Sequence, residues 1–155
     1  MSTAMKPSAN CLELIKASEG LRLAPYRCPA GVPTIGYGNT RYADGRAVKL
    51  TDPPITKTQA DALLMATLQP YADAVNRYVQ VELSQNQFDA LVDFTYNLGP
   101  QALRTSALLK LLNAGNYAGA ADQFDVWVMG GGHRLTGLVA RRAAEKELFL
   151  RREES

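Results

Sequence analysis

The sequence contains few residues of the kinds that build metal sites, disulfide scaffolds or membrane spans. It has two cysteines, Cys11 and Cys28, and one histidine, His133, with no Cys-x-x-Cys pair. Without ligands at metal spacing, a zinc site is not expected. No apolar run approaches the roughly 18 residues of a membrane-spanning helix, so stable membrane insertion is not expected either.

An excess of charge of one sign is also lacking. The 155 residues include 17 basic and 15 acidic ones, a net charge of +2. That excess is too small to indicate a nucleic-acid partner, and no basic recognition helix stands out. The N-terminus shows no basic region followed by an apolar one, so no secretory signal is recognised and accumulation in the cytoplasm is expected. The 46% hydrophobic share is that of an ordinary globular domain.

The beginning of the chain has a helical pattern. It predicts a helix that starts near Pro7 or Ser8 and ends at Gly20, with Glu19 in its last turn. An acidic residue is unfavourable there because the carbonyl end of a helix repels negative charge. Glu19 is therefore either exposed at little cost or retained for a purpose.

Residues 22–42 have the composition of strands and turns. Pro, Gly, Tyr, Val, Thr and Ile dominate the stretch, and PAG and GYGN are turn signals. We expect a small antiparallel hairpin or meander that carries Cys28 and Thr34.

From residue 56 onward the patterns are helical. Thr56 with Gln59, and Ser84 with Gln87, form capping boxes that start two helices. The first is expected to be interrupted at Pro70 and followed by another helix, whereas the second should be the central buried helix. Further helices are expected over residues 102–113, 117–128 and 135–151, with a GGGH loop before the last.

The C-terminal helix carries alternating basic and acidic residues. This alternation predicts a solvated face of i,i+4 ion pairs, with contact to an anionic envelope polymer as the alternative. The charged residues are Arg141, Arg142, Glu145, Lys146, Glu147, Arg151, Arg152, Glu153 and Glu154. All elements together predict an α+β fold, in which an N-terminal helix and a small antiparallel sheet pack on a mainly helical C-terminal bundle.

Three motifs of the chain resemble those of a known family. Residues 19–40, E-G-x-R-x-x-P-Y-x-C-x-x-G-V-x-T-I-G-Y-G-N-T, resemble the active-site segment of the phage-type lysozymes, glycoside hydrolase family 24, in its lambdoid-phage and prophage endolysin branch. SQNQFDALVDFTYNLG resembles the family's central helix, and GGGHRLTGLVARRAAEKELF resembles its C-terminal motif. The motifs occur in the family's order from about residue 12 to residue 150.

The resemblance implies an endolysin, a muramidase that hydrolyses the β-1,4 bond between N-acetylmuramic acid and N-acetylglucosamine in peptidoglycan and lyses the host cell. It implies no metal or cofactor. It implies one lysozyme-like domain over residues 1–155, with the active site in a helix plus β-rich lobe at about 8–52 and a helical lobe at about 56–152. A monomer would wait in the host cytoplasm for a holin-type lesion, then reach the periplasm and cell wall.

The resemblance also implies roles for three residues. In the family a glutamate is followed nine positions later by an aspartate and fifteen positions later by a threonine. Glu19 and Thr34 match this spacing, whereas Cys28 occupies the aspartate position. Glu19 is implied as the general acid and Thr34 as a residue that orients water.

Cys28 has three possible roles. It could be an inert packing residue, a thiolate that replaces the aspartate, or half of a disulfide with Cys11. A thiolate could accept a proton from water, which we prefer, or attack the anomeric carbon and change the stereochemical outcome. The loss of the aspartate also leaves a second function open, that of a catalytically silent peptidoglycan-binding protein.

Two further residues are implied near the cleft. Tyr96 and Asn97 end the central-helix motif, where a ring could lie against a sugar and an amide could bind its acetamido group. Their alternative roles are a core aromatic residue and an amide near the helix end. Arg141 and Arg142 are expected to brace the C-terminal helix rather than contact substrate.

Overall fold

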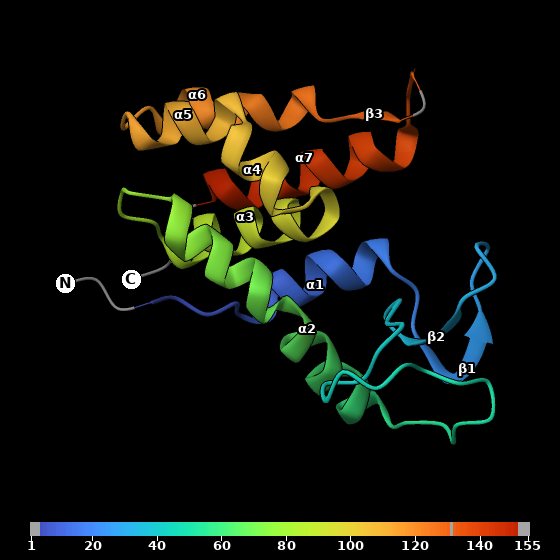
Figure 1. Ribbon diagram of the computed structural model, residues 1–155. Coiled ribbons are helices and arrows are strands. Elements are labelled where there is room, and N and C mark those ends of the chain that lie inside the picture. The colour runs from blue at the N-terminus through green and yellow to red at the C-terminus, as the bar shows by residue number, and fades with distance from the viewer. Residues whose placement is uncertain (1–3, 131, 152–155) are drawn as a thin grey trace.

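The computed structural model (Figure 1) describes residues 4–130 and 132–151. Its helices and strands confirm the predicted α+β architecture. The elements are α1 (Ala9–Ser18), β1 (Arg22–Arg27), β2 (Pro33–Gly36), α2 (Lys57–Tyr78), α3 (Gln85–Leu98), α4 (Pro100–Thr105), α5 (Ala107–Asn113), α6 (Tyr117–Gln123), the 3₁₀ turn η1 (Phe124–Val126), β3 (Met129–Gly130), β4 (His133–Arg134) and α7 (Thr136–Leu150).

Helix α1 begins and ends close to the predicted residues. Its N-cap residue, Ser8, makes no cap bond within the helix. Instead, the Ser8 backbone N–H donates to Asp89 Oδ1 of α3 at 3.0 Å, and the Ser8 hydroxyl donates to the same carboxylate. Cys11 and Ile15 are fully buried. The apolar stripe of α1 thus packs against the helices that follow later in the chain.

Residues 20–56, called the β-rich segment below, contain the predicted antiparallel hairpin. Tyr26 pairs with Thr34 and Arg27 with Pro33, and the register shifts between Arg22 and Tyr26. Buried Ile35 of β2 joins a small apolar cluster with Val48 and with Leu63 of α2. This cluster fixes the hairpin on the first turns of α2.

Helix α2 continues through Pro70, so the predicted interruption is wrong. Pro70 is exposed, while apolar side chains before and after it are buried in the same core, including Leu64, Leu68, Ala72 and Val75. Packing on both sides outweighs the backbone hydrogen bond that a proline removes. Figure 1 shows α2 running from the β-rich segment at the lower right to the helical part at the upper left.

Helix α3 is the central buried helix, as predicted. Its capping box is present, and the predicted apolar positions from Phe88 to Thr95 are buried. Two of the later predictions need correction. The helix expected over 102–113 divides at Ser106, whose hydroxyl accepts from the Leu109 N–H and starts α5. The helix expected over 117–128 ends at Gln123 and tightens into η1, after which Met129–Gly130 and His133–Arg134 form a short hairpin.

The charged residues of helix α7 do not all lie on the solvated face that the sequence predicts. Arg141, Arg142 and Glu145 are buried because they face polar groups of α3. The expected exposed i,i+4 ion pair is present at the C-terminal end of α7, where Arg151 pairs with Glu147. Residues 152–155 of the predicted face lie outside the described residues.

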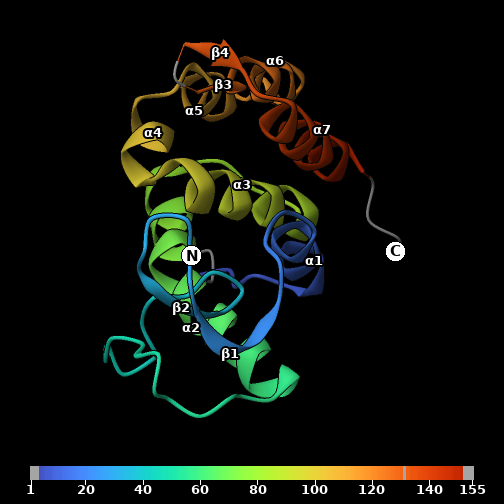
Figure 2. The ribbon, with the colours of Figure 1, turned by 90° about the vertical axis from the view of Figure 1, so that its right-hand side faces the viewer.

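The helices pack around α3 into one core. Figure 2, turned by 90°, shows β1 and β2 below α3, with α2 passing behind them. Within residues 4–130 and 132–151, no helix combines the length and the apolar character needed to cross a bilayer.

Candidate active site

Glu19 lies just beyond the last residue of α1. It is the C-cap residue, its backbone is extended, and its N–H donates to the Ile15 carbonyl at 2.7 Å. Its side chain is 35% exposed and turns toward the loop after β2. A Cβ at Gly38 would lie 3.3 Å from Glu19 Oε2, and Gly38 has a φ of +86°. Only glycine therefore allows the carboxyl group to sit against this turn without strain.

Arg141 holds the Glu19 carboxyl group on its other side. Arg141 Nη1 lies 3.6 Å from Glu19 Oε1. The same guanidinium donates to both oxygens of the buried Asp93, at 3.0 and 2.6 Å. A forked pair of this kind fixes the orientation of an arginine. Helices α1, α3 and α7 thus position Glu19 together.

The Arg141–Asp93 pair belongs to a larger buried cluster. Glu145 is completely buried and lies 2.7 Å from Arg142 Nε. Its burial, followed by hydrogen bonding to Asp93, raises the pKa of Glu145 well above the ordinary value. The expectation that Arg141 and Arg142 brace α7 agrees with these contacts. Arg141, however, also reaches the proposed acid.

Cys28 sits at the start of the tight turn between β1 and β2. Its N–H donates to the Val32 carbonyl at 3.0 Å, and its carbonyl accepts from Gly31 at 2.7 Å. Hydrogen bonding from the backbone N–H of Val32 is the main reason that the pKa of the thiol is lowered. The N–H of Ala30 and the side chain of Thr34 act in the same direction, whereas desolvation opposes them. Backbone N–H groups that converge in a turn stabilise an anion, here a thiolate.

Thr34 lies on β2 beside Cys28 and is 2% exposed. Its hydroxyl donates to the Val32 carbonyl at 2.9 Å, which fixes the oxygen within the hairpin. Because a hydroxyl has one proton, it can turn from Val32 to the sulfur when the thiolate forms. The structure thus brings Cys28 and Thr34 together on the β-rich segment and places Glu19 at its edge, beside Gly38.

The lowered pKa of Cys28 predicts a measurable reactivity. We expect iodoacetamide to alkylate Cys28 in the folded protein with a pH midpoint below about 8.5, the value of an unperturbed thiol. Alkylation rates from pH 6 to pH 10, followed by mass spectrometry, measure this midpoint. A cysteine peptide of the same turn sequence is the reference, and a midpoint equal to or above that of the peptide would contradict the prediction.

Cys11 cannot compete in that measurement while the protein is folded. It is completely buried, and burial, followed by nearby carboxylates, raises the pKa of its thiol. Cys11 and Cys28 are both free thiols. The structure therefore has no disulfide between Cys11 and Cys28. An inert packing residue and a thiolate are the two roles left open to Cys28.

Tyr96 lines a pocket beside Glu19. The pocket has a volume of about 330 Å³ and runs between the turn at Gly38–Ala43 and helices α2 and α3. Tyr96 meets Tyr71 of α2 edge to face, with ring centroids 5.2 Å apart. Its burial, followed by the negative charge of Glu19, raises the pKa of Tyr96. A sugar contact by Tyr96 stays a prediction, and its place in the pocket supports it.

Asn97 has a partner inside the protein. Its Oδ1 accepts a hydrogen bond from Arg142 Nη2 at 2.8 Å. The amide nitrogen of Asn97 makes no hydrogen bond among the described residues and could donate to a substrate. Substrate binding by Asn97 stays a prediction.

Sequence reasoning missed several residues that surround Glu19. The roles of Arg141, Asp93, Gly38 and Tyr71 follow from contacts between distant elements. One signal was present, because Asp89 and Asp93 lie four residues apart on the buried face of α3. Buried carboxylates require partners, which here are Ser8 and Arg141. Among the described residues, no group of three or more His, Cys, Asp or Glu side chains could hold a metal ion.

Comparison with known proteins identifies the family to which the chain belongs. A sequence model described as phage lysozyme matches residues 16–145. The chain belongs to the phage lysozyme family. An endolysin of Acyrthosiphon pisum secondary endosymbiont phage 1 is 42% identical to this phage lysozyme over 149 residues, which are 94% of this chain and 98% of that protein.

Solved structures of phage lysozymes share the fold. An endolysin from Escherichia coli O157:H7 phage FAHEc1 has a TM-score of 0.86 and 40% identity, covering 97% of this chain and 96% of that one. A P22 lysozyme mutant has a TM-score of 0.87 and 39% identity, covering 95% and 99%. This phage lysozyme is therefore an endolysin and a muramidase, a glycoside hydrolase whose substrate is peptidoglycan. The predicted family, fold and reaction class are confirmed.

Proposed function

We propose that Glu19 is the general acid for cleavage of the β-1,4 bond between N-acetylmuramic acid and N-acetylglucosamine, and that Cys28 with Thr34 activates water. The observation that carries the proposal is the arrangement of the hairpin, in which Cys28 begins the turn and the neighbouring Thr34 hydroxyl is fixed on β2, with the Glu19 carboxyl group held beside that hairpin by Arg141. Acid-catalysed glycoside cleavage needs these two kinds of group on opposite faces of the sugar.

Proton movements define the roles of the two groups. Glu19 donates its proton to the bridging oxygen as the bond from that oxygen to the anomeric carbon breaks. Water attacks the anomeric carbon from the other face and loses a proton to the Cys28 thiolate. The water-derived oxygen remains on the sugar, and exchange with solvent restores both groups. The backbone N–H groups around Cys28 favour the thiolate that this step requires.

Tyr96 and Asn97 are proposed to contact the sugar chain in the pocket beside Glu19. The Tyr96 ring offers an apolar edge next to Tyr71, and the Asn97 nitrogen offers a donor for an acetamido oxygen. The enzyme is proposed to act as a monomer. It would remain in the host cytoplasm until a holin-type lesion gives it access to the cell wall.

Two substitutions at Cys28 test the role of the thiolate. Cys28→Ser should reduce the clearing of outer-membrane-permeabilised cells about 10²-fold or more, because a serine hydroxyl does not ionise near neutral pH. Cys28→Asp should retain activity, because a carboxylate replaces the thiolate. Clearing is followed by turbidity under reducing conditions.

The same measurement also tests the alternative of a silent glycan-binding protein. Clearing by Cys28→Ser at the wild-type rate would reject a chemical role for the thiol. Absence of clearing by wild type and by Cys28→Asp would support the silent binder. Cys11→Ala is the matched control, since Cys11 is buried away from the hairpin, and it should clear cells like wild type at temperatures where it is folded.

A further inference from the structure

Positive charge is concentrated on the β-rich segment, residues 20–56. The segment carries a net charge of +3, although the whole chain carries only +2, so the remaining residues have a net charge of −1. Its acidic residues lie in one loop, where Asp52 accepts from the Lys49 N–H and the Tyr42 hydroxyl. The charged residues are Arg22, Arg27, Arg41, Arg46 and Lys49 against Asp44 and Asp52.

Most of this positive charge has no carboxylate partner. Within the described residues, Arg46 is the basic residue of the segment that makes an ion pair, with Asp52 at 3.6 Å. Arg27 and Arg41 each donate instead to a backbone carbonyl four residues further on, at 2.9 and 2.8 Å. Outside the segment, by contrast, basic residues such as Lys16, Lys57, Lys146 and Arg151 have acidic neighbours.

Large apolar side chains are exposed on the same segment. Leu21, Leu23, Val32 and Leu50 are between 37% and 42% exposed. They are half of the exposed large hydrophobic residues in the described part of the chain. The Ile55 N–H donates to the Leu23 carbonyl at 2.8 Å, so the loop that follows Leu50 runs along β1.

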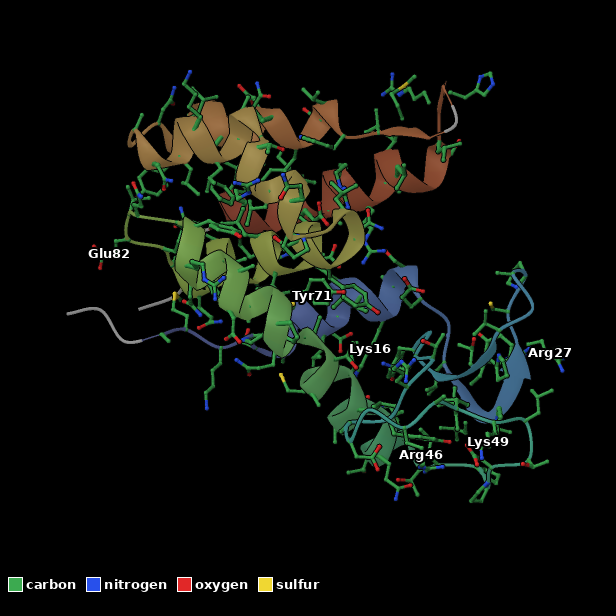
Figure 3. All side chains as sticks on the ribbon, in the orientation of Figure 1. Lys16, Arg27, Arg46, Lys49, Tyr71 and Glu82 are labelled. Atoms are coloured by element: carbon green, nitrogen blue, oxygen red, sulfur yellow. The ribbon has the colours of Figure 1, made fainter. Side chains whose placement is uncertain are left out.

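Three of the basic residues lie at the outer edge of the molecule. Figure 3 shows Arg27, Arg46 and Lys49 along the outer edge of the β-rich segment, whereas Lys16 and Tyr71 lie near the centre of the molecule and Glu82 at its opposite end. This outer edge therefore carries Arg27 and Lys49, which make no ion pair among the described residues, and Arg46, which pairs with Asp52, while exposed apolar side chains belong to the same segment.

We propose that this outer face of the β-rich segment binds the surface of anionic phospholipid membranes. Basic side chains are attracted to lipid phosphates, and neighbouring leucines enter the boundary between head groups and acyl chains. An anionic wall polymer would attract the cations, but it offers the leucines no apolar phase. The combination therefore favours lipid, and the enzyme would associate with a membrane without spanning it.

Vesicle binding tests the proposal independently of hydrolysis. The full chain is sedimented with vesicles of phosphatidylglycerol and phosphatidylcholine in equal amounts, and with vesicles of phosphatidylcholine alone. Wild type should bind the anionic vesicles and not the neutral ones. Arg46→Gln/Lys49→Gln should bind about 30-fold more weakly, because each basic residue near such a surface contributes about fivefold. The control Arg77→Gln/Lys110→Gln removes the same charge from exposed positions on α2 and α5 and should change binding less than about threefold.

Two more variants separate charge, apolar contact and folding. Leu50→Ser should weaken vesicle binding, whereas Leu150→Ser, at an exposed leucine of α7, should not. Lys49→Gln alone should weaken vesicle binding about fivefold. This single variant leaves Arg46 in place, so it tests the charge effect even if replacing Arg46 disturbs its loop.

Three results would overturn the proposal. Wild type could fail to sediment with anionic vesicles, or the two double variants could lose binding equally, which would show a net-charge effect. Alternatively, Arg46→Gln/Lys49→Gln could lose binding to purified peptidoglycan while its vesicle binding is unchanged, which would identify the wall polymer as the partner.

Discussion

Replacing Glu19 with glutamine should reduce peptidoglycan hydrolysis about 10³-fold, within the range that a general acid contributes. Glutamine has nearly the shape of glutamate, so it fits against Gly38, but it has no acidic proton to give to the bridging oxygen. The measurement is turbidity clearing of permeabilised cells, together with the release of reducing ends from purified peptidoglycan.

The matched control for this substitution is Glu13→Gln. Glu13 lies on the same helix, is exposed, and makes a weak ion pair with Lys16 at 3.8 Å. Glu13→Gln should clear cells like wild type. If Glu19→Gln retains more than about a tenth of the wild-type rate while its thermal unfolding is unchanged, Glu19 is not the general acid.

Replacing Asp93 with alanine should lower the free energy of unfolding by about 3–5 kcal/mol. The substitution removes one partner of a buried pair and leaves the Arg141 guanidinium, which is 7% exposed, without its forked acceptor. Urea unfolding followed by circular dichroism measures the loss. A control is Asp73→Ala on the exposed face of α2, which should cost less than about 0.5 kcal/mol.

Activity provides a second measurement for Asp93. Since Asp93 orients Arg141, and Arg141 lies against Glu19, the folded fraction of Asp93→Ala should also hydrolyse peptidoglycan more slowly. If the free energy of unfolding falls by less than about 1 kcal/mol and the activity per folded molecule is unchanged, Arg141 keeps its position without Asp93.

The parts of the fold that depend on local chemistry could be predicted from the sequence. Both capping boxes form as predicted, because Thr56 and Ser84 need only the backbone three residues away. The continuation of α2 through Pro70 could not be predicted in this way. Its cause is burial on both sides of the proline, which depends on the positions of other helices.

The same distinction applies to the active site. The spacing of Glu19, Cys28 and Thr34 could be recognised along the chain, and so could the unusual cysteine. The buried cluster around Arg141 could not, since its charges alternate along α7 as they would on a solvated helix. Only the position of Asp93 on the opposite helix shows why those charges are buried.

The continuity of α2 has a consequence for how the enzyme can be tuned. Glu19 is held by α1, α3 and α7, whereas Cys28 and Thr34 belong to a hairpin seated on the first turns of α2. The separation between the proton donor and the water site therefore depends on the stiffness of α2, which lacks one backbone hydrogen bond at Pro70, as well as on the contact of Glu19 with the turn at Gly38. A substitution at Pro70, far from any reacting atom, would alter the rate by changing the distance between the proton donor and the water site.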